Sequence, residues 1–193
     1  ARRIPGDLAS RLEARVEAMV VGDPLHDATT MGPLIDAKAA ERVAGEVERA
    51  KSEGVSLLTG GERPSELADG HFVTPALFTN VDPASRLGQE EFFGPILGII
   101  PVDDIDEAIA VANSVRYGLS ASLFTRDLGR AMQFVREIKA GIVHVNSETA
   151  GAEPQVPFGG YKASSSYSRE QGKSAREFYT QVKTVYMDPP PAS

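Results

Sequence analysis

Apolar residues recur at helical spacing in the first quarter of the chain. They stand four residues apart between Asp7 and Val21, which predicts a helix that Gly22-Asp23-Pro24 ends. A second helix is expected to begin near Asp36, a residue type suited to capping a helix N-terminus, and to end at Gly54 in a left-handed C-cap. Its predicted buried face consists of Ala39, Val43, Val47 and Ala50.

Two short strands are expected after this second helix. Val55 to Thr59 follows it directly, and a polar loop then leads to an apolar, extended stretch from Phe72 to Phe78. Pro75 lies inside the second stretch and favours a sheet edge or a bulge, because proline has no N–H to donate to a neighbouring strand.

From residue 96 onward, strand-like and helical patterns alternate. The apolar run at 96–100 is typical of a strand buried on both faces, and further strands are expected at 119–123 and 142–145. Helical stripes lie between them, at 105–112 and 128–138. The alternation predicts an α/β fold: an open, mainly parallel sheet with flanking helices and right-handed crossovers.

The C-terminal region follows a different pattern. A short helix is expected at 168–177, and the alternation in Gln181–Met187 predicts a strand. Such a terminal strand is either a sheet edge or a pairing element for another chain. Three consecutive prolines in 188–193 cannot continue a sheet, so this stretch is expected to be a mobile tail.

Charge and composition narrow the class of protein. The chain has 193 residues and a net charge of −7, whereas a nucleic-acid-binding protein needs a basic face, so no nucleic acid partner is expected. No apolar run is long enough to cross a membrane, and no secretion signal precedes the first helix. We expect a globular, cytoplasmic protein with no membrane partner.

The chain contains 0 cysteines, which excludes disulfides, thiolate metal sites and a thiol nucleophile. His26, His71 and His144 stand far apart and show no ligand spacing, so no metal site is expected. His144, within a predicted strand, is interpreted as a partly buried structural histidine.

Two carboxylates beside two aromatic residues, in Gln89–Pro95, form the first candidate for a binding site. One carboxylate could accept hydrogen bonds from a polyol such as a ribose diol, while an aromatic ring lies against a flat ligand ring. The alternative is that Glu90 and Glu91 are solvated and that Phe92 and Phe93 belong to the core.

A second candidate is the aperiodic loop from Asn146 to Lys162, which follows a predicted parallel strand. Ligands in open parallel sheets bind at the loops after the strand C-termini. Phe158 could form a pocket wall, and Gly159-Gly160 permits close backbone approach. The alternative is an ordinary turn. No glycine-rich phosphate-binding motif is present in the sequence.

Six short motifs occur in an order that resembles NAD(P)-dependent aldehyde dehydrogenases in their C-terminal part. The resemblance extends from about Leu8 to Tyr186. The motifs are Gly22-Asp23-Pro24, Met31-Gly32-Pro33-Leu34-Ile35, Glu90-Glu91-Phe92-Phe93-Gly94-Pro95, Tyr117-Gly118-Leu119-Ser120-Ala121, Gly141-Ile142-Val143-His144-Val145-Asn146 and Pro157-Phe158-Gly159-Gly160-Tyr161-Lys162.

The resemblance implies a role for particular positions. Glu91 matches the glutamate that binds the nicotinamide-side ribose hydroxyls, and Phe93 matches the aromatic residue near the nicotinamide. Phe158 matches an aromatic residue of the substrate tunnel. The loop from Asn146 to Val156 matches the segment that shapes the tunnel mouth. The strand at 181–187 matches one that joins an oligomerisation sheet.

The family mechanism requires a cysteine thiolate that attacks the aldehyde, followed by hydride transfer to NAD or NADP and hydrolysis of a thioester. The resemblance places that cysteine, the general base and the dinucleotide-binding domain upstream of the matched region. We therefore expect 1–177 to be an incomplete catalytic domain and 178–193 an oligomerisation strand with a tail. No catalytic residue is assigned, and the isolated chain is expected to be inactive and to bind little or no NAD or NADP.

Within the family, the segments Asn146–Gly151, Lys162–Ser166, Arg169–Gly172 and Glu177–Thr180 are similar to the 2,5-dioxopentanoate (α-ketoglutarate semialdehyde) dehydrogenase branch. The loop departs from that branch at Glu148 and at Ala152-Glu153-Pro154. The other function considered is a naturally truncated, non-catalytic binding or assembly module.

Overall fold

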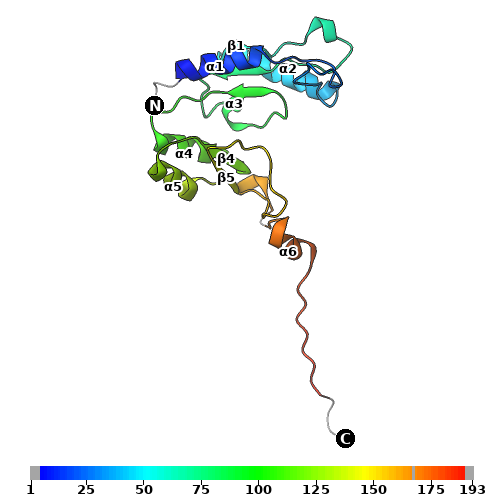
Figure 1. Cartoon of the computed structure of the whole chain (residues 1–193), viewed down its shortest axis with the longest axis vertical. Coiled ribbons are helices and arrows are strands. Elements are labelled where there is room, and N and C mark those ends of the chain that lie inside the picture. Colours follow the sequence, from blue (N-terminus) through cyan, green and yellow to red (C-terminus); the bar gives the residue numbers. More distant parts are fainter. Residues whose placement is uncertain (1–4, 167, 190–193) are drawn as a thin grey trace. The chain divides into compact units, whose positions relative to one another are not determined.

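The computed structural model describes residues 5–166 and 168–189, without the side chains of residues 5 and 6. Chain contacts divide the protein between Val115 and Arg116 into two compact units, which we describe separately. Both units combine helices with short strands, which confirms the predicted α/β class (Figure 1).

The first unit contains a three-stranded sheet in the order β1-β2-β3. β1 and β2 are antiparallel, whereas β2 and β3 are parallel. The elements are α1 (Pro5–Glu17), α2 (Ala37–Ser52), β1 (Ser56–Thr59), a 3-10 turn (Ser65–Leu67), β2 (Ala76–Thr79), α3 (Arg86–Gln89), β3 (Ile96–Gly98) and α4 (Ile105–Ser114).

The second helix agrees closely with its sequence pattern. Asp36 caps α2, and its side-chain oxygen accepts a hydrogen bond from the Ala39 backbone N–H at 2.7 Å. Gly54 follows the helix at φ +82°, the left-handed conformation expected of it. The predicted apolar face is buried, and Val47 packs with Phe78 of β2 in the core. α2 therefore covers one face of the sheet.

The first helix is shorter than predicted, since α1 ends at Glu17. Val20 and Val21 lie in extended chain instead, because both run beside Met31: the Met31 N–H donates to the Val20 carbonyl at 3.1 Å, and Val21 forms a bridge with Met31. This long-range pairing overrides the helical spacing of the apolar residues.

Two expectations about the sheet are wrong. β2 is the central strand, although Pro75 favoured an edge; the strand begins at Ala76, so the proline lies just outside it. β3 was expected to be buried on both faces, but Leu97 is 46% exposed. β3 stands at the edge of the three-stranded sheet, with its neighbour β2 on one side.

The second unit contains β4 (Ser120–Leu123), α5 (Leu128–Glu137) and β5 (Ile142–Val145). The two strands are parallel, with α5 as the connection, as the alternation predicts. The buried residues of α5 are Ala131 and Phe134, whereas Leu128 and Val135 are exposed, so the predicted stripe is partly wrong. Short 3-10 turns follow at 162–164 and 172–174.

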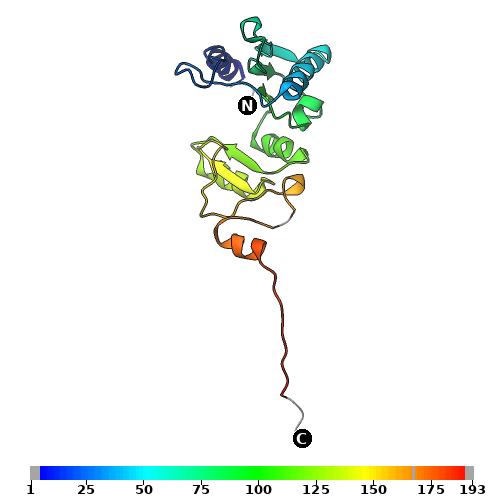
Figure 2. The same ribbon diagram turned by 90° about the vertical axis from the view of Figure 1, so that its right-hand side faces the viewer.

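The C-terminal region contains less regular structure than expected. The helix predicted at 168–177 is a 3-10 turn followed by α6 (Ala175–Tyr179). Residues 181–187 follow as extended chain outside any assigned strand, with Val182 98% and Tyr186 89% exposed (Figures 1 and 2). The tail predicted at 188–193 falls partly on 190–193, outside the described residues.

The described helices are all too short or too polar to cross a membrane. Within the same residues, no group of three or more histidine, aspartate and glutamate side chains is placed to hold a metal ion.

Candidate functional site

The segment Glu90–Pro95 separates its two aromatic residues. Phe92 is 8% exposed and belongs to the core, whereas Phe93 is 76% exposed. Phe93 has φ +48°, a left-handed conformation that is rare and strained for a bulky residue. Glu91 is exposed beside it. The alternative interpretation, with both rings in the core, is therefore wrong for Phe93.

Three contacts fix the backbone around the exposed ring. The Arg42 side chain donates to the Phe92 carbonyl at 3.3 Å, and the Arg86 guanidinium lies 5.9 Å from the centre of the Phe92 ring. A methyl group placed on Gly94 would lie 2.3 Å from a Val43 methyl carbon, so the chain there approaches α2 closely. The residues on both sides of Phe93 are thus held by contacts, while the Phe93 ring is exposed.

Arg86 also binds a carboxylate of α2. Its Nε and Nη2 atoms donate to the two Glu46 carboxylate oxygens at 3.0 and 2.8 Å, which makes a bidentate ion pair. The hydrogen bond from Arg86 lowers the pKa of the Glu46 carboxyl below its ordinary value, although burial opposes this effect. The ion pair connects α3 to α2, and its arginine is the one that lies over the Phe92 ring.

Asn146 lies at the carboxyl end of β5, at φ +59°. Its side-chain oxygen accepts from the Thr125 backbone N–H at 2.8 Å, and its side-chain nitrogen donates to the Thr125 carbonyl at 2.9 Å. The Asn146 backbone N–H donates to Leu123 at 2.9 Å. The amide group is thus used to join the two strand ends.

Phe158 is half-buried and lies in a short bridge with Glu170. The Phe158 N–H donates to the Glu170 carbonyl at 2.6 Å, and the Glu170 N–H donates back at 2.9 Å. The following glycines are buried, and a methyl group placed on Gly141 would lie 1.9 Å from the Gly159 carbonyl oxygen. The turn after Phe158 therefore packs directly on the chain that enters β5.

The chain that follows β5 bonds to both ends of β4, through Asn146 at one end and Tyr161 at the other. Asn146 bonds to the chain beyond the carboxyl end of β4, whereas Tyr161 donates to the Gly118 carbonyl, ahead of the amino end of β4, at 2.8 Å. Four-residue strands separate such ends by at least about 10 Å. The loop after β5 thus runs from one end of the sheet back to the other.

Lys162 follows this turn at φ +54°. Burial lowers the pKa of its ammonium group, and the nearby positive charge of Lys139 lowers it further. In the sequence Lys162 belongs to a recognised motif, but no role was assigned to it.

His144 is half-buried in β5, in agreement with the partial burial predicted for it. Its Nδ1 lies 3.2 Å from the Ser147 hydroxyl. The Ser122 hydroxyl of β4 donates to the Ser147 carbonyl at 2.5 Å. Together with the hydrogen bonds between Asn146 and Thr125, these contacts hold the start of the loop.

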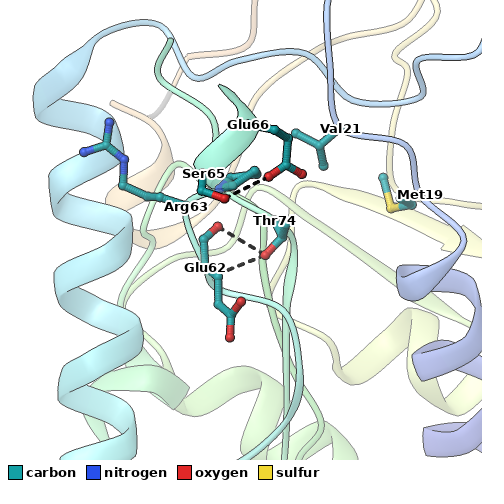
Figure 3. A pocket seen from close by; sticks show the side chains of 8 residues that line it. Met19, Val21, Glu62, Arg63, Ser65, Glu66 and Thr74 are labelled. Atoms are coloured by element: carbon teal, nitrogen blue, oxygen red, sulfur yellow. Dashed lines mark hydrogen bonds between the residues drawn. The ribbon is translucent and has the colours of Figure 1, made fainter. Parts of the chain in front are cut away.

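The first unit also has an open hollow of about 390 Å³ beside the chain that follows α1 (Figure 3). Its lining residues bond to one another: the Glu62 N–H donates to the Thr74 hydroxyl at 2.9 Å, and this hydroxyl donates to the Glu62 carbonyl at 3.2 Å. The wall contains none of the four residues predicted for cofactor or substrate.

Some residues that shape these sites were given no role in the sequence analysis, although Arg169 and Glu170 lie in a segment that resembles the semialdehyde dehydrogenase branch. Thr125 and Glu170 act through backbone atoms, which any residue type provides, so the sequence carries no signal for them. Arg169 donates from its side chain to the Gly160 carbonyl, and the signal available was a charged residue in a segment rich in small residues.

The family model for the aldehyde dehydrogenase family matches residues 1–185. The chain belongs to the aldehyde dehydrogenase family. It is 45% identical, over 93% of its length, to the alpha-ketoglutaric semialdehyde dehydrogenase of Bacillus subtilis. It is 47% identical, also over 93% of its length, to the alpha-ketoglutarate semialdehyde dehydrogenase of Haloferax volcanii.

Among solved structures, an aldehyde dehydrogenase of Mycobacterium tuberculosis complexed with NAD+ matches 93% of the chain at 38% identity, with a TM-score of 0.87. The chain spans 37% and 38% of the two curated relatives and 37% of this structure. The aldehyde dehydrogenase fold is therefore shown for the region that these proteins share.

Proposed function

We propose that this chain supplies the C-terminal, cofactor- and substrate-contacting part of an NAD(P)-dependent aldehyde dehydrogenase. The observation that carries the proposal is the family match over residues 1–185. The α/β elements and the exposed Glu91 and Phe93 support it. No comparison favours the alternative of a non-catalytic module.

Glu91 and Phe93 fit a role in holding the cofactor. The Glu91 carboxylate is exposed and suited to accept hydrogen bonds from the ribose hydroxyls next to the nicotinamide. The Phe93 ring is 76% exposed and held at a fixed backbone angle, so it offers a flat apolar surface to a ring. The bound NAD or NADP supplies the acceptor for the hydride that leaves the aldehyde carbon.

Phe158 and the loop that begins at Asn146 are assigned to the substrate side. Phe158 contributes an apolar wall to the tunnel, and the loop shapes the tunnel mouth. The amide of Asn146 bonds to Thr125, so it acts by fixing the start of the loop. The two semialdehyde dehydrogenase relatives support α-ketoglutarate semialdehyde as the substrate.

The chain has no cysteine and so cannot form the thiohemiacetal by itself. We propose that residues 1–177 belong to the catalytic domain, that 181–187 pairs with another subunit in a homo-oligomer, and that the enzyme acts in the cytoplasm. The isolated chain is expected to be inactive and to bind NAD or NADP weakly, because a ribose contact does not replace an adenine and pyrophosphate site.

The test is a chimeric enzyme in which these 193 residues replace the matching segment of the Bacillus subtilis relative. We expect the chimera to oxidise α-ketoglutarate semialdehyde with NAD+ or NADP+, and the isolated chain to show no turnover. Glu91→Gln should raise the KM for the cofactor about tenfold, whereas Glu41→Gln, an exposed control in α2, should not change it.

A folded chimera without aldehyde oxidation would contradict the proposed function. Turnover by the isolated chain would contradict the argument about the missing nucleophile. Micromolar NAD affinity of the isolated chain, measured by calorimetry, would contradict the expected weak binding.

A further inference from the structure

We propose that Arg169 is a positioning residue, which holds the Phe158–Tyr161 turn in place and thereby fixes the Phe158 ring. The place of Phe158 in a substrate tunnel rests on the proposed function.

The guanidinium group of Arg169 makes two contacts with the turn. Its Nη1 atom donates to the Gly160 carbonyl at 2.5 Å, a charge-assisted hydrogen bond of the stronger kind. Its guanidinium carbon lies 5.1 Å from the centre of the Tyr161 ring, within cation–π range. Arg169 is half-buried, which reduces competition from water for both interactions.

The backbone of the turn leaves space for this side chain. Gly159 has φ +154°, and a methyl group placed on it would lie 3.0 Å from both Cδ and Nη1 of Arg169. The arginine therefore lies where a side chain at residue 159 would project. The glycine pair in the turn thus serves close packing against Arg169 as well as backbone freedom.

The residue after Arg169 holds the other end of the turn. Glu170 exchanges two backbone hydrogen bonds with Phe158, at 2.6 and 2.9 Å. The Arg169 side chain therefore bonds to Gly160, and the Glu170 backbone bonds to Phe158. These two bonded positions stand two residues apart in the turn. Loss of the arginine should release one end and let the Phe158 ring take several positions.

Hydrogen exchange in the 193-residue chain tests the positioning role without any catalytic activity. Arg169→Gln should speed exchange of the Phe158 amide at least tenfold and leave the amides of the β4–β5 pair unchanged. Arg169→Lys keeps a positive charge and a donor without the planar guanidinium, so it should recover part of the protection. Arg130→Gln, which removes an exposed arginine paired with Asp127, is the matched control.

Kinetics of the chimera test the consequence for substrate. Arg169→Gln should raise the KM for the aldehyde fivefold or more while the KM for NAD+ changes less than twofold. Unchanged exchange at Phe158, a uniform rise across the second unit, or an unprotected Phe158 amide in the parent chain would overturn the positioning role. An inactive chimera combined with the expected exchange pattern would instead overturn the proposed function.

Discussion

Asn146 bonds to Thr125 through both ends of its side-chain amide and so extends the pairing of β4 and β5 by one step beyond the strands. The loop after a parallel strand must leave the sheet, and here a side chain fixes the point of departure. The backbone at Asn146 is left-handed, with φ +59°, a conformation that asparagine tolerates better than most residues.

Two substitutions at Asn146 separate the effect of its side-chain hydrogen bonds on stability from the effect of its left-handed backbone. Asn146→Ala removes the hydrogen bonds to Thr125. It also leaves an alanine in the left-handed region, without the side-chain bonds that stabilise this conformation for asparagine. It should reduce the free energy of unfolding by about 2 kcal/mol. Asn146→Gly restores the backbone freedom and should lose about half as much. Urea unfolding of the three proteins measures both values; equal losses would show that backbone strain contributes nothing.

The close packing of Gly141 predicts a large effect from one methyl group. Gly141→Ala should destabilise the chain by about 3 kcal/mol, because the new carbon would meet the Gly159 carbonyl, which cannot move alone. Gly45→Ala in α2 is the control: nothing lies within 4 Å, and alanine favours the helix by about 1 kcal/mol. Thermal unfolding should move in opposite directions for the two variants.

The two adjacent phenylalanines should respond differently to truncation. Phe92→Ala removes a buried ring and should cost about 3 kcal/mol of unfolding free energy. Phe93→Gly removes an exposed ring and relieves the left-handed strain, so stability should stay the same or rise. Chemical unfolding distinguishes them, and a comparable loss at both positions would contradict a ligand-facing Phe93.

The Glu46–Arg86 ion pair predicts a pH-dependent contribution to stability. The pKa of Glu46 is lowered in the folded chain, so its stabilisation is fully present above the unfolded carboxyl pKa of about 4.3. The contribution is lost as the pH falls through the lower folded value. The stability difference between the parent and Glu46→Gln should therefore shrink from pH 7 to pH 3. In an Arg86→Gln background the effect of Glu46→Gln should be smaller but still present, because the Arg49 side chain lies 3.5 Å from the Glu46 carboxylate.

The exposed segment 181–187 predicts self-association of the isolated chain. Val182 and Tyr186 share a face of the alternating sequence and are almost fully exposed. Unpaired extended chain with apolar residues favours strand pairing between copies. Sedimentation should show larger species as concentration rises, and Val182→Lys with Tyr186→Lys should shift the equilibrium toward the monomer. A monomeric parent at high concentration would refute this expectation.

The sequence predicts the elements whose signals are local. Asp36 and the apolar spacing behind it are sufficient to define α2, and the β4–α5–β5 unit follows from alternation and length. Errors occur where a distant partner decides. Val20 was predicted to be helical but lies in extended chain beside Met31. The exposure of β3 depends on which strands pair with it. Periodicity records neither of these relationships.

The candidate site was predictable in its residue types but not in its bonding. The sequence placed Glu91, Phe93, Asn146 and Phe158 in two aperiodic segments, and both segments are surface turns or loops. The residue pattern alone did not distinguish Phe92 from Phe93, and the family resemblance was needed to select Phe93, because the exposure of its ring comes with a left-handed backbone that the pattern does not indicate. Nor did it indicate that the Asn146 amide is bonded to backbone.

The loop between Asn146 and Phe158 is fastened at both ends, by Thr125 at one and by Glu170 at the other. Residues 148–152 between these anchors are exposed. The Gly172 N–H donates to the Pro154 carbonyl at 3.2 Å, so the later part of the loop also contacts the chain beside the Glu170 anchor. Single substitutions at 148–152 should therefore change the surface of the loop without loosening its ends. The glycines after Phe158 leave no such room, because Arg169 and neighbouring backbone occupy the space that a larger side chain would need.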